Sequence, residues 1–152
     1  MIIRKYKRSD FENVFKLYLA LDDSEDKFDS NLVPSKKILE EDRKEVMKRL
    51  NKRSTICLIA ENDGVICGVI DGYIIESIYY KEKVSYLDHL YVIDKYRRKK
   101  VGQSLIEEFT KIAQQKNAKY LKLNAFENNI PAVNLYKKLG FEEYSIYYSK
   151  KI

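Results

Sequence analysis

The fold of this chain is set by residues 84–113, VSYLDHLYVIDKYRRKKVGQSLIEEFTKIA. Residues 84–92 favour a strand, because β-branched and aromatic side chains are frequent in them. Further on, apolar side chains recur at helical spacing: Leu105, Ile106, Phe109, Ile112 and Ala113. Between strand and helix lies the basic loop, residues 95–102, in which five of the six residues from Lys95 to Lys100 are cationic. The start of a helix presents unpaired N–H groups and the positive end of its dipole, so the basic loop is suited to hold an anion such as phosphate.

Strands and helices extend from this segment in both directions. Before the basic loop, the expected elements are a strand at 2–6, a helix with capping-box spacing from Ser9, a helix at about 36–50, and strands at 54–61, 65–79 and 84–92. After the loop come the helix described above, a strand at about 120–126, a helix that begins near Pro131 and ends just before Gly140, which suits the left-handed position past its end, and a strand at 143–150. The turn Asn62-Asp63-Gly64 joins two strands as a hairpin. This order predicts an α+β fold, with a mixed, mostly antiparallel sheet in a single domain over residues 1–152.

Composition excludes several classes of protein. The 152 residues are 45% apolar and 34% charged, which is typical of a globular domain that buries its own core. No stretch approaches the roughly 20 apolar residues of a membrane span, and the first residues lack the apolar region of a signal peptide. We therefore expect a cytoplasmic protein without membrane association.

The two cysteines are predicted to be free thiols. If Asp63-Gly64 is the two-residue turn of the hairpin, Cys57 lies opposite Ile70 and not opposite Cys67. Two buried thiols are then the better interpretation, and a disulfide the poorer one. Two separate cysteines and one histidine also argue against a structural zinc site, so no metal is expected.

Charge is unevenly distributed over the chain, which carries a net +6. Five carboxylates and only one base, Lys27, lie between Asp22 and Ser30, whereas the basic loop carries the opposite sign. One interpretation is that both segments are solvated loops. The other is that they hold an anionic cofactor and a cationic substrate.

Two segments resemble the Gcn5-related N-acetyltransferase (GNAT) family. The first segment is residues 87–102, which partly keeps the family motif Arg/Gln-x-x-Gly-x-Gly/Ala. Arg97 and Gly102 match the two ends of the motif, but Lys100 stands where the family usually has glycine, and Arg98 replaces another frequent glycine. The second, residues 129–141, keeps the pattern Asn-x-x-Ala-x-x-Leu-Tyr-x-x-x-Gly-Phe intact. The resemblance covers essentially the whole chain. It implies a GNAT-like fold of about four helices around a twisted sheet whose central strand pair is splayed.

The resemblance also implies acetyl-CoA as donor. Its pyrophosphate would lie on the backbone N–H groups of residues 98–103, and backbone groups of Leu90 and Val92 would pair with the pantetheine arm. The N–H near Leu90 would also polarise the thioester carbonyl. The implied cofactor-binding residues are Leu90, Val92, Arg97, Arg98, Lys99, Lys100, Val101, Gly102, Gln103 and Asn129. On local grounds Asn129 is equally suited to cap the next helix, and Lys100 in place of glycine resists a left-handed backbone.

Tyr136 matches the general acid of the family, which protonates the departing thiolate; without the family match, a packing tyrosine is the simpler interpretation. Two residues are candidates for the general base. Asp88 aligns with a glutamate that some members use, and His89 is the only histidine, with a suitable intrinsic pKa. Alternation along a strand sends the two to opposite faces, unless a bulge intervenes, and a water relay is a third option.

The predicted reaction is transfer of an acetyl group from acetyl-CoA to a primary amine, by direct attack in a ternary complex. The acidic segment favours a cationic small-molecule acceptor of the polyamine or aminoglycoside type, with a protein amine as the alternative. A homodimer is compatible with the family. Two other functions remain open: a nucleic-acid-binding module that uses the cations at 95–100, and a GNAT-like protein that binds coenzyme A without catalysis. No helix-turn-helix, RNA-recognition or zinc signature accompanies the basic loop, so nucleic acid is not the expected partner.

Overall fold

The computed structural model describes residues 1–29, 31–32, 37, 40–150 and 152. Its centre is a five-stranded sheet in the order β1-β2-β3-β4-β5. Neighbouring strands are antiparallel except β4 and β5, which are parallel. The strands are β1 (Ile2–Lys5), β2 (Thr55–Asn62), β3 (Val65–Ile75), β4 (Val84–Val92) and β5 (Tyr120–Leu123). The predicted α+β class and mixed sheet are confirmed.

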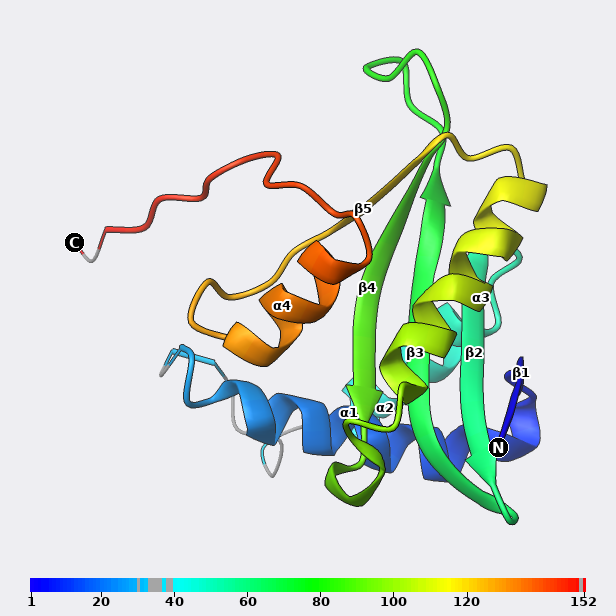
Figure 1. Cartoon of the computed structure of the whole chain (residues 1–152). Coiled ribbons are helices and arrows are strands. Elements are labelled where there is room, and N and C mark those ends of the chain that lie inside the picture. Colours follow the sequence, from blue (N-terminus) through cyan, green and yellow to red (C-terminus); the bar gives the residue numbers. More distant parts are fainter. Residues whose placement is uncertain (30, 33–36, 38–39, 151) are drawn as a thin grey trace.

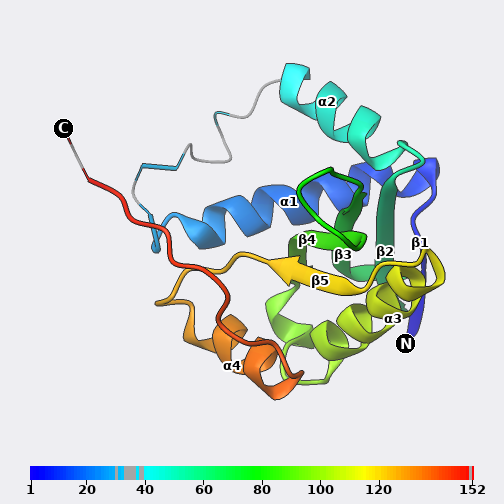
Figure 2. The same cartoon turned by 90° about the horizontal axis from the view of Figure 1, so that it is seen from above.

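Helices cover both faces of the sheet (Figures 1 and 2). On one face lie α1 (Phe11–Glu25) and α2 (Glu40–Leu50), and on the other α3 (Val101–Gln115) and α4 (Ile130–Lys138). Alternation along β2 supplies both cores, since Leu58 packs in the cluster under α3 and Ile59 in the cluster under α1. The predicted apolar stripe of α3 is confirmed, with Leu105 and Phe109 fully buried.

The hairpin between β2 and β3 forms at the predicted turn. Asp63 and Gly64 both have positive φ, +49° and +77°, as a two-residue hairpin turn of type I′ requires. The predicted register is wrong by one residue. A bulge next to Ala60 inserts Cys67 as an extra residue, so Cys57 faces Asp71 instead of Ile70. Both cysteines are free and buried, as predicted.

A second bulge lies in β4. Asp71 pairs with His89 and Gly72 with Leu87, so Asp88 is the extra residue. On the other side of β4, pairing with β5 ends at Leu87. From residue 88 to residue 92 no strand of the described chain lies on that side, and β4 and β5 diverge in Figure 1. This is the splayed strand pair that the sequence predicts.

The predicted last strand at 143–150 is wrong, because residues 141–150 are irregular. Its aromatic residues favour a strand locally, but a strand needs a hydrogen-bonded neighbour, and among the described residues this segment has none. Tyr144, Ile146, Tyr147 and Tyr148 are left exposed.

Several predicted boundaries also move. β3 ends at Ile75 and β5 at Leu123, earlier than expected, while the predicted start of the second helix lies outside the described residues. Ser9 does not cap α1; instead a carboxylate oxygen of Asp10 accepts the N–H of Lys7 at 2.7 Å. No helix in the described part of the chain is both long and apolar enough to cross a membrane.

Candidate active site

The basic loop passes through a short 3₁₀ turn (Asp94–Tyr96) into α3. Arg98 and Lys100 both adopt the left-handed region, with φ of +58° and +63°. The first regular helical hydrogen bond runs from Ser104 N–H to the carbonyl of Lys100, at 2.9 Å. Within the described chain, the N–H groups of residues 98–103 have no backbone acceptor. The loop therefore offers a series of free donors at a helix N-terminus, which is an anion-binding arrangement.

Not every cation of the loop is directed outward. The guanidinium of Arg97 donates from Nε to the carbonyl of Val92 at 2.8 Å and pairs with Asp94 at 3.0 Å. Its own N–H is bonded to the carbonyl of Asp94. Lys95 and Lys99 both lie over the ring of Tyr96. Arg97 thus braces the entry to the loop, in addition to any contact with a ligand.

The left-handed backbone at Lys100 gives a stability prediction. We expect Lys100→Gly to be more stable than Lys100→Ala by about 1 kcal/mol, because glycine adopts positive φ without the clash of a Cβ. Both variants lack the ammonium group and serve as controls for each other. Urea unfolding of the two variants measures the difference, and equal stabilities would contradict a strained loop.

Residues 90 and 92 direct backbone groups into the gap beside β4. Ile93 N–H donates to the carbonyl of Cys67 on the β3 side, at 3.0 Å. Because successive residues of a strand present their backbone groups to opposite sides, the N–H groups of Leu90 and Val92 point away from β3. Those groups are free for a ligand on the side where β5 has diverged.

A buried carboxylate, Asp71 of β3, lies behind this part of β4. Oδ1 of Asp71 accepts hydrogen bonds from the hydroxyl of Tyr18 (α1) and from Nδ1 of His89, both at 2.9 Å. Oδ2 of Asp71 pairs with Arg49 of α2. Asp88 lies 3.4 Å from both Arg49 and His89. The bulge therefore places Asp88 and His89 on the same side of the sheet, so regular alternation does not hold here and the exception for a bulge applies.

Asp71, Asp88 and His89 have the composition of a metal site. The guanidinium of Arg49 contacts both carboxylates, however, and supplies the positive charge that a metal ion would bring. These residues fit an ion-pair network better than a cation site.

The pKa of His89 is raised from the ordinary value of 6.5. Burial lowers it, but the hydrogen bond that His89 donates to Asp71 and the negative charges of Asp71 and Asp88 raise it by more, against an opposing effect of Arg49. His89 is thus more easily protonated than a free imidazole.

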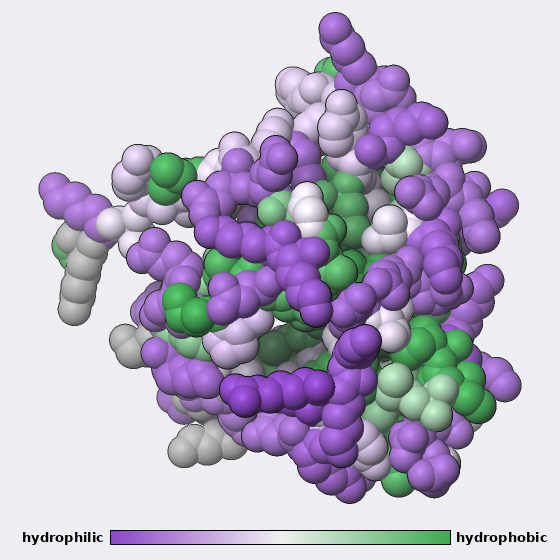
Figure 3. Space-filling view, viewed as in Figure 1, coloured by the Kyte–Doolittle hydropathy of each residue, from purple (hydrophilic) through white to green (hydrophobic). Residues whose placement is uncertain are grey.

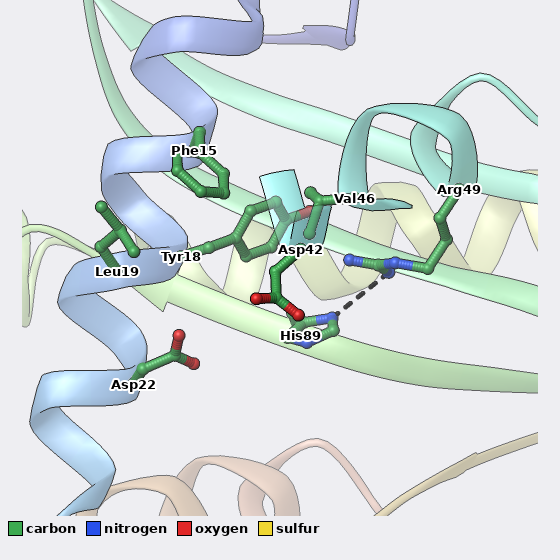
Figure 4. Close-up of a pocket in the computed structure, with 8 residues that line it drawn as sticks. All are labelled: Phe15, Tyr18, Leu19, Asp22, Asp42, Val46, Arg49 and His89. Atoms are coloured by element: carbon green, nitrogen blue, oxygen red, sulfur yellow. Dashed lines mark hydrogen bonds between the residues drawn. The ribbon is translucent and has the colours of Figure 1, made fainter. Parts of the chain in front are cut away.

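His89 borders a pocket of about 140 Å³ between α1, α2 and β4 (Figure 4). The other lining residues are Phe15, Tyr18, Leu19, Asp22, Asp42, Val46 and Arg49. The predicted acidic loop is in part helical, because Asp22 and Glu25 belong to the end of α1. Burial raises the pKa of both carboxyls, while the charge of His89 opposes the change. Two carboxylates, Asp22 and Asp42, therefore line the pocket together with His89.

Tyr136 of α4 approaches the same region from the other face of the sheet. Burial, assisted by the charge of Glu25, raises the pKa of Tyr136 to about 12. Phe141 packs edge-on against its ring, with 5.7 Å between the ring centres. Figure 3 shows a hollow with apolar surface between α4 and α1. Glu25, at the end of α1, interacts electrostatically with both His89 and Tyr136.

Asn129 precedes α4, as predicted, but its side chain makes no capping hydrogen bond. Ala132 and Val133 instead donate to its backbone carbonyl. The side chain is therefore not used as an N-cap, and its proposed contact with the cofactor arm stays a prediction. Gly140 has φ of +83° just past the end of α4, as predicted.

Sequence reasoning missed Asp71, Tyr18 and Arg49. Asp71 is the one charged residue in the apolar run from Val65 to Ile75, and a lone charge in such a strand signals a buried, paired group. Tyr18 and Arg49 lie in ordinary amphipathic helices, and nothing in their local sequence separates them from surface residues.

Comparison with known proteins agrees with this architecture. A sequence profile of the acetyltransferase (GNAT) family matches residues 18–141. The chain is 29% identical over 107 residues to an N-alpha-acetyltransferase of Sulfurisphaera tokodaii; the match covers 66% of this chain and 64% of that relative. The chain thus spans less than two thirds of the length of this curated relative.

Two solved structures share the fold. One is a mutant of the BH1408 protein of Bacillus halodurans, with a TM-score of 0.89 at 16% identity, covering 100% of this chain and 99% of the other. The other is an aminoglycoside acetyltransferase from an uncultured soil metagenomic sample in complex with sisomicin, with a TM-score of 0.75 at 18% identity and coverage of 99% and 95%. The fold and the splayed sheet define an α+β protein of the GNAT type. The chain belongs to the acetyltransferase (GNAT) family.

Proposed function

We propose that this protein is an acetyl-CoA-dependent N-acetyltransferase, which transfers the acetyl group directly to a primary amine in a ternary complex. The observation that carries the proposal is the gap between β4 and β5. Free backbone donors at the start of α3 lie at one end of β4, His89 belongs to β4 itself, and Tyr136 belongs to α4 on the other face of the sheet. A long ligand with an anionic end and a reactive end fits such a path.

The donor would be held mainly by backbone groups. Residues 98–103 would donate N–H groups to the pyrophosphate, with Lys99 and Lys100 adding charge. Leu90 and Val92 would pair with the amides of the pantetheine arm. The N–H of Leu90 would then stabilise the negative charge that develops on the thioester oxygen.

In the reaction, the amine nitrogen attacks the thioester carbon, and the carbon–sulfur bond breaks. A general base takes one proton from the acceptor ammonium, and the hydroxyl of Tyr136 gives a proton to the departing thiolate. The second proton leaves the nitrogen as the amide forms and restores the Tyr136 hydroxyl. A pKa of about 12 keeps that phenol protonated at neutral pH. The chain's cysteines are poorly suited to carry the acetyl group, because burial raises the pKa of both thiols. Direct transfer is therefore favoured over an acyl-enzyme.

The acceptor is proposed to carry a further cationic group. The carboxyls of Asp22 and Glu25 are half-buried beside the pocket, and an incoming ammonium would relieve the electrostatic cost of keeping them charged. The structural neighbour that binds sisomicin, a polycationic aminoglycoside, is in line with this class of acceptor. A protein amine is the alternative, in line with the N-alpha-acetyltransferase relative.

Asp22→Asn is expected to raise KM for a cationic acceptor about tenfold, equivalent to about 1.4 kcal/mol, because the variant loses a charge next to the pocket. Asp23→Asn is the matched control: it removes the same charge one residue away, at an exposed position. Initial rates with varied acceptor give both KM values. Equal effects of the two variants would contradict a direct role of Asp22.

The proposed function is tested by calorimetry and by an acceptor screen. We expect binding of acetyl-CoA, and no binding of a nonspecific DNA duplex at physiological salt. Micromolar binding of the duplex without binding of acetyl-CoA would support the nucleic-acid alternative instead. The screen follows release of free thiol from acetyl-CoA with polyamines, aminoglycosides, amino acids and peptides. Binding of acetyl-CoA without turnover on any acceptor would favour a non-catalytic protein. The cytoplasmic location stays a prediction.

A further inference from the structure

Asp71 is an unusual residue for the middle of a sheet. Its side chain is completely buried, and three groups from three different elements converge on it: Tyr18 of α1, Arg49 of α2 and His89 of β4. Burying a carboxylate is costly unless it is fully paired, and here both oxygens are. Such a group costs stability that an apolar residue at the same position would not, which points to a functional role.

The hydrogen bond between Asp71 and His89 determines which imidazole nitrogen is available. Two groups face Nδ1 of His89: Oδ1 of Asp71 at 2.9 Å, and Nη1 of Arg49 at 3.4 Å (Figure 4). A carboxylate only accepts and its contact is the shorter, so Nδ1 is assigned the proton in both charge states of the ring. In the neutral ring the lone pair is then on Nε2. Nε2 has no hydrogen-bond partner among the described residues, and His89 borders the pocket (Figure 4).

We infer that Asp71 is a positioning residue that makes His89 the general base and fixes Nε2 as the atom that takes the proton. The inference rests on the proposed acetyl transfer. Nε2 of neutral His89 accepts one proton from the acceptor ammonium, which leaves a neutral amine to attack the thioester. The resulting imidazolium is stabilised by its hydrogen bond to Asp71. The base is later restored by loss of that proton to solvent.

The surroundings of His89 decide the pH at which this base works. Asp71 and Asp88 favour its charged form, and Arg49 opposes it. From α1, Asp22 and Glu25 interact with it electrostatically, and the ring of Tyr18 packs edge-on at 5.1 Å; Asp42 of α2 lines the same pocket. The net effect raises the pKa of His89 above 6.5. As the pH falls, the ring therefore becomes protonated, and the neutral base is lost, at a higher pH than for a free imidazole. Activity should therefore decline on the acidic side earlier than with a free imidazole.

Two substitutions should move this pKa in opposite directions. Asp71→Asn removes the negative partner and should lower the pKa of His89 by about one unit. Tyr18→Phe removes the hydroxyl that shares Oδ1 of Asp71 with His89. More negative charge then remains on that oxygen, so the pKa of His89 should rise. Opposite signs test the coupling of His89 to Asp71; whether this coupling serves catalysis is decided by the pH dependence of kcat in the same variants.

The test is nitrogen-15 NMR of the imidazole ring during a pH titration, on the whole chain with any affinity tag removed. His89 is the only histidine, so its signals need no assignment. We expect the Nδ1–H tautomer, and pKa shifts of opposite sign in the two variants. An Nε2–H tautomer, or an unchanged pKa in Asp71→Asn, would overturn the inference. Tyr120→Phe, at an exposed position on β5, is a control that should shift nothing.

The NMR result does not depend on any acceptor or on turnover, so it is separable from the proposed function. If the protein transfers acetyl groups, the acidic limb of the kcat profile should move with the pKa of His89 in each variant. A correct tautomer with an acidic limb that moves in neither variant would overturn the role of His89 as base. Asp71→Asn could fail to fold, because Arg49 loses its buried partner. In that case Tyr18→Phe alone must raise the pKa of His89 and move the acidic limb of the kcat profile to higher pH.

Discussion

Tyr136→Phe is expected to lower kcat about a hundredfold at saturating acetyl-CoA, with little effect on the fold. The hydroxyl is the group proposed to protonate the coenzyme A thiolate as it leaves, and a positioned acid contributes at least this factor. Burial keeps the pKa of this phenol at about 12, so the proton is present throughout the neutral range. Removing one oxygen leaves the ring and its edge-on contact with Phe141 in place.

Initial rates of thiol release measure this effect, and acetyl-CoA affinity by calorimetry shows whether the donor site is intact. Tyr120→Phe is the matched control, because it loses the same hydroxyl from an exposed position outside the site. A kcat unchanged within twofold in Tyr136→Phe, with normal acetyl-CoA binding, would leave Tyr136 as a packing residue only.

Gly72→Ala is expected to destabilise the protein by about 3 kcal/mol or more. A Cβ at residue 72 would collide with the carbonyl oxygen of Tyr86, and would lie 2.8 Å from Cζ of the buried Phe109. Neither neighbour moves easily, since one is backbone of the paired strand and the other is core. Gly72 also lies where the pairing of β3 and β4 shifts, so β4 can only move at the expense of the bulge that orients Asp88 and His89.

The effect is measured by urea unfolding, with acetyl transfer as a second readout at a temperature where the variant is folded. Gly102→Ala is the control for stability, since its Cβ would find only an ordinary contact at 3.4 Å with Leu135. A loss below 1 kcal/mol in Gly72→Ala would mean that the two strands separate easily. The close packing of Gly72 against Tyr86 and Phe109 would then not be what keeps the bulge in β4 in place.

The local pattern of the sequence predicted most of the fold. Apolar periodicity located α3, and Asp63-Gly64 located the hairpin, because both depend on residues close in the chain. The strand at 143–150 was wrong for a related reason. Its side chains satisfy the local preference, but pairing requires a neighbour that local sequence does not reveal.

The same distinction between local and long-range information applies to the candidate site. The two motifs predicted the loop before α3 and Tyr136 as site residues, and Arg98 and Lys100 adopt positive φ although neither is a glycine. The relation of Asp88 to His89 depended on whether β4 contains a bulge, because one extra residue in a strand reverses the side that each following residue faces, and only the structure shows that bulge.

The sequence by itself determined the family and the order of the elements up to α4, and it predicted a loop suited to phosphate, because motif and periodicity are properties of consecutive residues. Only the tertiary structure decided the surroundings of His89. Tyr18, Arg49 and Asp71 are distant in sequence, and they meet because the sheet and two helices must bury their apolar faces together. A buried carboxylate has to be paired by whatever that packing brings within reach, and here the packing brings the one histidine of the chain.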